Sequence, residues 1–380
     1  MAPMRLRIPH WFAERVEPVP DHQILRVSTL ELFFDLVFVF TVTQFTVLLA
    51  HDFASFPQVL LMFTVIWWMY AGYAWLTNAV PPVRAIRQFL MLLAMGGWLI
   101  IALAIPEAFG ANGTVFGLGL LLVVVVHGLL YLQSTWRFLT MFGTNLLAVA
   151  LILFAAGTST ELTYILWILA LVIMWSSPYL TGQRGFPLHP GHVAERHGLV
   201  VIIALGESVV AIAIGIGDAP LTIPVIGTAL IGLALSAALW WAYFHADLDR
   251  AEHALLHTTD QVRRTRLVLF AFAYAHIPIL IGIITLSAGV KKAVSHPADS
   301  LPLGPQLALS GGVALFLLGS AAFRFILSLP GALRRAATAL LTLATIPAGA
   351  LSAALQLTLL VALLTAAFAL EMRTDHPQPA

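Results

Sequence analysis

Charged residues are scarce in this chain, and cysteine is absent. Only 10% of the 380 residues are Asp, Glu, Lys or Arg, against about 25% in soluble domains. Without cysteine, disulfides, thiolate metal sites and cysteine nucleophiles are excluded. The net charge of +1 gives no reason to expect a nucleic-acid partner, and we expect none.

The start of the sequence also lacks the pattern of a removable signal peptide. The first 27 residues are rich in Arg, Glu, Pro and His, and no apolar core precedes a small-residue cleavage site. We therefore expect the first apolar segment to be retained as a helix.

Long apolar stretches are what the chain has in abundance. The mean hydropathy is +0.93, and stretches of about 20 apolar residues can cross about 30 Å of hydrocarbon as helices. The sequence predicts an all-α, polytopic membrane bundle of about twelve transmembrane helices. Whether residues 332–371 form a hairpin or one bent element is left open. The predicted segments are roughly 29–50, 58–79, 88–109, 114–133, 138–157, 161–181, 198–217, 222–245, 267–289, 306–328, 332–348 and 350–371.

The basic residues orient these segments. With both termini in the cytoplasm, all 17 arginines fall on the cytoplasmic side, and only Lys291 and Lys292 fall outside. This asymmetry follows the positive-inside rule, and a miscount of one segment would destroy it. We therefore predict cytoplasmic N and C termini.

Four landmarks recur in the same order in both halves of the chain, which predicts an internal repeat. Six segments per copy is an even number, so the copies would be parallel repeats with a site between them. The expected divisions are an N-terminal cytoplasmic segment 1–27, a first repeat 28–181, a cytoplasmic linker 182–197, a second repeat 198–371 and a cytoplasmic tail 372–380. The landmark pairs are Asp35 with Glu207, Trp67–Tyr70 with Trp240–Tyr243, Arg84–Arg87 with Arg263–Arg266, and Trp136–Phe138 with Phe323–Phe325.

Asp35 and Glu207 are carboxylates inside apolar segments. A charge near the bilayer centre costs at least about 2.5 kcal/mol, so such groups normally face a cavity, a partner or a proton. No Arg or Lys is expected deep in a segment, which leaves a proton, a histidine or a bound cation to neutralise them. Glu31 shares a helix face with Asp35, but Ser28-x-x-Glu31 is also a capping box.

Other polar and aromatic side chains extend this candidate proton or cation site. His127 and His276 lie within predicted segments and titrate near neutral pH, so they are either proton relays or packing residues. The tryptophan pairs are typical of interfacial belts, with a cavity wall as the alternative. Candidate cavity-lining residues are Gln44, Trp68, Tyr70, Trp241 and Tyr243.

Two polar clusters fall on the cytoplasmic side. The first, from His189 to His197, contains Glu195 and Arg196, and we interpret it as solvated loop polarity. The second, from His245 to Asp249, contains Asp247 and Asp249; we give it the same interpretation, with Mg²⁺ on a diphosphate as the alternative. Neither has a zinc-ligand spacing. We predict no metal site and no cofactor.

Two long motifs carry a family resemblance. Leu30-Glu31-Leu32-Phe33-Phe34-Asp35-Leu36-Val37 and Glu195-Arg196-His197, running on to Gly206-Glu207-Ser208-Val209, resemble the bacterial low-temperature-requirement A (LtrA) family. The resemblance covers about residues 22–370 and includes Trp241 and His276. It implies a multi-pass inner-membrane protein, named from a cold-growth phenotype, without a settled activity.

Three functions remain open. The first is proton- or cation-linked transport, or a channel, using the intramembrane carboxylates between two repeats. The second is an intramembrane enzyme that uses the same carboxylates as general acid and base on a lipid or isoprenoid. The third is an accessory or sensory membrane protein. The expected partners are membrane lipid, a proton or small cation, and an unidentified solute or lipid substrate; the oligomeric state is left open.

Overall fold

A computed structural model describes residues 27–79, 81–131, 138–181, 188–245 and 247–374, and these residues form helices and no strand. The all-helical, polytopic bundle predicted from the sequence is confirmed. Residues 1–26, 182–187 and 375–380, from the predicted N-terminal segment, linker and tail, lie outside the described residues, as do Trp136 and Arg137.

The described helices follow the apolar stretches closely. In the first half they are α1 Thr29–His51, η1 Phe53–Ser55, α2 Phe56–Ala79, α3 Ala85–Ala104, η2 Ile105–Glu107, α4 Gly113–Tyr131, α5 Phe138–Ala155, α6 Thr160–Thr181 and α7 Pro190–Ile216. In the second half they are α8 Ile223–Phe244, α9 Asp247–Leu256, α10 Gln261–Val268, η3 Leu269–Tyr274, α11 His276–Ser295, α12 Leu303–Ile326, α13 Ala332–Leu343, α14 Ile346–Gly349 and α15 Ala353–Thr374.

Ten helical stretches in the described chain are long and apolar enough to cross a membrane. Two predicted segments are shorter: α5 has an apolar stretch at Thr140–Ala155, and α13 has 12 residues. At 1.5 Å per residue α13 extends only about 18 Å. The predicted segment 332–348 is therefore wrong in its extent, because α13 ends at Leu343 and a separate short helix, α14, starts at Ile346. The question left open at 332–371 is answered by α13, α14 and α15 as separate helices.

The chain divides into two compact units. Unit 1 comprises Met1–Phe38 and Val65–Val193, and unit 2 comprises Val39–Thr64 and Ala194–Ala380. The core of unit 1 is rich in aromatic side chains from α1, α2 and α3, including Phe34, Trp67 and Trp98, all fully buried. Many large apolar side chains elsewhere are exposed, as expected of helices in contact with lipid.

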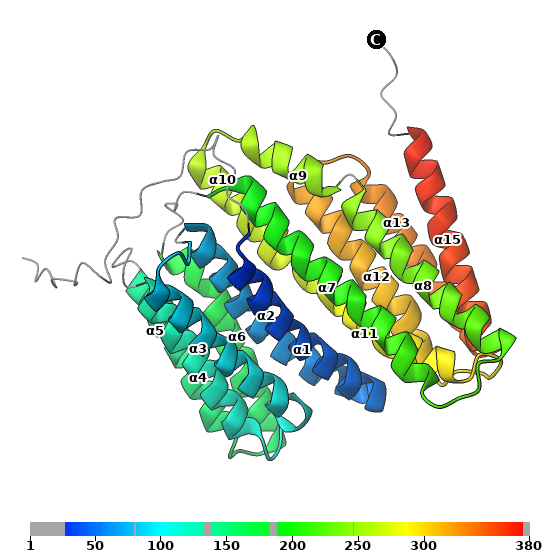
Figure 1. Ribbon diagram of the computed structural model, residues 1–380, viewed down its shortest axis with the longest axis horizontal. Coiled ribbons are helices and arrows are strands. Elements are labelled where there is room, and N and C mark those ends of the chain that lie inside the picture. Colours follow the sequence, from blue (N-terminus) through cyan, green and yellow to red (C-terminus); the bar gives the residue numbers. More distant parts are fainter. Residues whose placement is uncertain (1–26, 80, 132–137, 182–187, 246, 375–380) are drawn as a thin grey trace, which may run out of the picture. The chain divides into compact units, whose positions relative to one another are not determined.

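Close backbone packing characterises the core of unit 2. Helices α11 and α12 run alongside each other over most of their length (Figure 1). A Cβ atom on Gly282 would lie 2.6 Å from the Gly312 carbonyl oxygen, and one on Gly312 would lie 2.6 Å from the Leu286 nitrogen. Membrane helices gain little from apolar burial against each other, so small residues that allow such approach stabilise their packing.

Candidate functional site

Asp35 lies fully buried in α1, within unit 1. The phenol hydroxyl of Tyr70 in α2 donates a hydrogen bond of 2.9 Å to its Oδ1. The Tyr70 ring lies 4.4 Å from that of Phe38 and stacks on that of Trp67 at 5.1 Å. A carboxyl group in apolar surroundings needs such a donor to offset its lost hydration. The structure thus brings together two of the predicted site residues, Asp35 and Tyr70.

Glu31 forms the capping box that its spacing predicts. Both the backbone N–H and the hydroxyl of Ser28 donate to Glu31 Oε2 at 2.8 Å, and the Glu31 N–H donates to the Ser28 hydroxyl at 3.3 Å. The other carboxylate oxygen lies 3.2 Å from Nε2 of His192. Glu31 therefore has a structural role at the start of α1 and also a histidine partner.

The hydrogen bonds around His192 fix its tautomer. Asn78 Oδ1 accepts from the His189 N–H at 3.0 Å, so Asn78 Nδ2 faces the His189 carbonyl at 3.0 Å and His192 Nδ1 at 3.3 Å. An amide NH₂ only donates, so Nδ1 carries no proton and the ring proton lies on Nε2. That N–H points to Glu31, in a buried Asn–His–Glu chain.

Glu207 lies in α7, within unit 2, and is 3% exposed. Thr43 in α1 donates a hydrogen bond of 2.6 Å to its Oε2. Helix α11 extends beyond its predicted bound to Ser295 and so includes Lys291 close to its end. The expectation that no Arg or Lys lies deep in a segment stays a prediction.

Asp35 and Glu207 belong to different units, and each has a hydrogen-bond partner within its own unit. Their convergence on one site between two repeats stays a prediction.

His276 is fully buried and contacts Tyr243, so two more predicted residues come together. Its Nδ1 lies 2.9 Å from the Ala271 carbonyl oxygen, which only accepts, and its Nε2 lies 2.7 Å from the Tyr243 hydroxyl. The proton of the neutral imidazole is therefore on Nδ1, and Tyr243 donates to Nε2.

A π-helical turn, η3, positions the His276 ring. There the Ala275 N–H bonds to the Phe270 carbonyl at 3.0 Å instead of to Ala271, which leaves the Ala271 carbonyl accessible to the imidazole. Such single π turns are frequent at functional sites. The rings of Phe272 and His197 lie 5.4 Å and 5.1 Å from that of His276 and enclose it.

The remaining intramembrane candidates have other neighbours. His127 of α4 is packed between Tyr73 and Tyr131, each with ring centroids 4.9 Å away, beside Gly72. The indole N–H of Trp68 donates to Asn145 Oδ1 at 3.0 Å, which gives this tryptophan a structural role. Gln44 is half-buried.

The first cytoplasmic cluster is mostly not solvated loop. Helix α7 starts at Pro190, because proline suits the first helical position. The cluster therefore occupies the first two turns of a membrane-length helix, and only Glu195 is exposed as expected. The loop interpretation is wrong for the buried members His189, His192, Arg196 and His197.

In the second cluster, Asp249 fits the solvated interpretation and Asp247 does not. Asp247 is 2% exposed and binds Arg324 through both oxygens, at 2.8 Å to Nε and 2.7 Å to Nη2. Asp249 is exposed on the same helix, α9, where residues two apart point in different directions. The pair does not form a Mg²⁺ site, and the described residues contain no group of three or more metal-ligating side chains.

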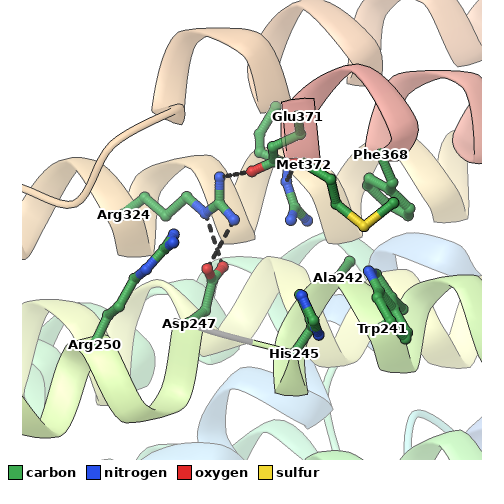
Figure 2. A pocket seen from close by; sticks show the side chains of 10 residues that line it. Trp241, Ala242, His245, Asp247, Arg250, Arg324, Phe368, Glu371 and Met372 are labelled. Carbon is green, nitrogen blue, oxygen red and sulfur yellow. Dashed lines mark hydrogen bonds and ion pairs between the residues drawn. The ribbon is translucent and has the colours of Figure 1, made fainter. Parts of the chain in front are cut away.

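Around Asp247, side chains from α8, α9, α12, α13 and α15 surround a cavity of about 390 Å³ in unit 2 (Figure 2). Arg324 also donates to Glu371, and Arg335 donates from Nε to the other Glu371 oxygen at 3.0 Å. The Arg335 guanidinium stacks 4.8 Å above the ring of Phe368. Trp241, predicted to line a cavity, is part of this wall and stacks on His245 at 4.1 Å.

Several of these residues escaped the sequence analysis. Arg324 served there for membrane orientation and as part of a repeat landmark, Arg335 served for orientation only, and Glu371 was not considered. A visible signal was that opposite charges lie at the ends of separate apolar segments. Asn78 and Thr43 are polar residues within apolar segments, but nothing in the sequence shows which carboxylate or histidine each one meets.

Comparison with known proteins adds the family. A family model described as "Bacterial low temperature requirement A protein (LtrA)" matches residues 26–370, from the start of α1 almost to the end of α15. The chain belongs to the LtrA family. A protein of Rhizobium meliloti (strain 1021), described as uncharacterized, is 29% identical over 318 residues, which cover 78% of this chain and 76% of the relative. No solved structure matches the chain significantly.

The LtrA match includes the two hydrogen-bonded pairs Asp35–Tyr70 and His276–Tyr243, and also Glu207. The resemblance seen in the motifs is confirmed. This LtrA family member is a multi-pass membrane protein, with ten helices suited to span the bilayer in the described chain.

Proposed function

We propose that this LtrA family protein carries a proton or small cation across the bacterial inner membrane, as a channel or coupled to a solute, with Glu207 as a principal site. The observation that supports this most directly is a buried carboxylate in a membrane-spanning helix, hydrogen-bonded to a hydroxyl. Ionisable groups at such depth are costly and are typical of ion and proton pathways.

The surroundings of Glu207 suit reversible charge. Thr43 donates to one carboxylate oxygen, which stabilises the ionised form, whereas burial favours the protonated form. A group poised between such opposing effects can change protonation as water or a cation approaches.

Asp35 is the second proposed site, in unit 1. It is fully buried and accepts a hydrogen bond from Tyr70, whose ring packs on Phe38 and Trp67. His276 and Tyr243 supply a neutral imidazole and a phenol joined by a 2.7 Å hydrogen bond, which is a suitable pair for passing a proton.

The proposal is tested with purified protein in liposomes, by following proton flux with an internal pH dye and cation flux with ion-selective dyes. Glu207→Gln keeps the size of the side chain and removes its charge, and we expect it to lower flux by at least about tenfold, because the neutral amide neither takes up a proton nor attracts a cation. Asp35→Asn should do the same. Glu161→Gln is the matched control, because Glu161 is exposed at the start of α6.

Flux that survives both substitutions unchanged, in protein with an unaltered thermal midpoint, contradicts the proposal. Lack of flux in the wild type together with turnover of a phospholipid or isoprenoid would instead favour the intramembrane enzyme.

A further inference from the structure

The cavity beside Asp247 has the chemistry of an anion site and takes no part in the proposed transport. It lies where α8, α12 and α15 end and where α9 and α13 begin, at the end of unit 2 that the arginine distribution predicts to be cytoplasmic. Figure 2 shows Arg324 between Asp247 and Glu371, and Trp241 near Phe368 on the other side.

Charge is not fully balanced by the acids that line this cavity. Its lining contains three arginines, Arg250, Arg324 and Arg335, and two carboxylates, Asp247 and Glu371. Arg324 is fully engaged with both carboxylates and with the Pro330 carbonyl. With three arginines to two carboxylates, the lining favours an anion over a cation.

Arg335 supplies a donor for that anion. Its side chain is 5% exposed, its Nε bonds to Glu371, and its Nη1 is buried with no hydrogen-bond partner in the described part of the chain. A buried guanidinium N–H that lacks a partner is costly, because the group has lost water and gained nothing in its place. An oxyanion in the cavity would accept from it, and the planar guanidinium suits phosphate well.

The size and walls of the cavity indicate more than a bare ion. About 390 Å³ falls within the roughly 300–1,000 Å³ of ligand pockets. Trp241, Phe368 and Met372 give it apolar walls. A ligand that combines an anionic head with an apolar part would satisfy both the arginine and the walls.

We propose that this cavity binds a phosphate group, with Arg335 as its principal donor and the Trp241 and Phe368 rings against the rest of the ligand. The two sources of such a group are a phospholipid headgroup and free phosphate. A lipid is favoured because its apolar part can pack against the apolar walls, whereas an inorganic ion would leave them without a contact.

The test measures binding to the purified full-length chain in a neutral detergent, by isothermal calorimetry. The probes are dihexanoyl phosphatidic acid, inorganic phosphate, and dihexanoyl glycerol, which has the same chains without the phosphate. We expect phosphatidic acid to bind and dihexanoyl glycerol to bind at least about tenfold more weakly, because charge-assisted hydrogen bonds supply the difference.

The variants exploit two neighbouring arginines. Arg335→Gln should weaken the binding of phosphatidic acid by at least about tenfold. Arg334→Gln should leave that affinity unchanged, because Arg334 is exposed and does not line the cavity. Should Arg335→Gln fail to fold because Glu371 loses a partner, Trp241→Leu replaces it. Trp241 is 38% exposed and takes no part in the ion pairs. Its loss should lower the affinity for phosphatidic acid more than the affinity for inorganic phosphate.

Binding of phosphatidic acid but not inorganic phosphate supports the proposal with a lipid as the source. Comparable affinity for both supports it with free phosphate as the source. Equal affinity for dihexanoyl glycerol, no binding of either phosphate probe, or equal losses in Arg335→Gln and Arg334→Gln overturns it. None of these readouts depends on flux, so the result is separate from that of Glu207→Gln.

Discussion

Tyr70 and Tyr243 occupy matching places in the two tryptophan–tyrosine motifs, and each donates its hydroxyl to a buried titratable group. Tyr70 bonds to Asp35 in unit 1, and Tyr243 bonds to His276 in unit 2. A phenol serves here because its ring packs in an apolar core while its hydroxyl supplies a hydrogen bond. At the scale of single residues, the aromatic motifs therefore hold the acid and the imidazole in place.

We predict that Tyr70→Phe destabilises the protein by about 1–3 kcal/mol, because Asp35 loses a buried donor while the packing of the ring is kept. The measurement is the thermal unfolding midpoint in detergent, which should fall. Tyr164→Phe is the control, because Tyr164 is half-buried in α6 and its ring lies 5.2 Å from that of Phe109. The unfolding midpoint of this variant should equal that of the wild type. Equal midpoints for wild type and Tyr70→Phe would show that the bond to Asp35 contributes nothing.

Helices α11 and α12 show how elements of this chain are stabilised. Gly282 of α11 faces Gly312 of α12, and the backbones are too close for a side chain on either. The adjacent Gly311 has no atom within 4 Å of the position its Cβ would take. One position in α12 therefore requires glycine, and its neighbour does not.

Gly312→Ala should destabilise the protein by about 1–3 kcal/mol, because the added methyl group forces the two backbones apart. Gly311→Ala should be neutral or slightly stabilising, since alanine favours helix and meets no neighbour. Both are measured as thermal midpoints of purified protein. A Gly311→Ala variant that loses as much stability as Gly312→Ala would contradict the close-packing account.

At the scale of the whole molecule, the number of membrane crossings decides which surfaces face the cytoplasm. In the described residues, ten helical stretches are long enough to span the bilayer, whereas α5 and α13 are shorter. The arginine distribution nevertheless predicts twelve crossings, because each one omitted reverses the side of everything that follows.

Because the chain has no cysteine, single cysteines report this topology without background labelling. We expect a membrane-impermeant maleimide to label Asp218→Cys and Ser300→Cys in intact cells, and His257→Cys only after permeabilisation. All three positions are exposed in the structure. The reverse pattern would falsify the crossing of α5, because all three positions follow it.

The sequence predicted the helical membrane bundle, the family and the Ser28–Glu31 capping box, because these depend on hydropathy, long motifs and spacing along one chain. It also singled out Asp35, Tyr70, Tyr243 and His276, since polar groups and aromatic pairs in apolar segments are conspicuous. It misplaced the His189–His197 cluster, because the start of α7 depends on Pro190 and on packing that buries Arg196.

The amino-acid sequence alone thus determined that the chain lies in a membrane and which side chains are costly there, since both follow from local composition, and it predicts which way the chain faces. Only the tertiary structure decided the pairings: Thr43 with Glu207, Tyr243 with His276, and Arg324 with Asp247 and Glu371. These partners lie 33 to 164 positions apart. Contacts over such separations arise from helix packing, and no local pattern in the sequence encodes them.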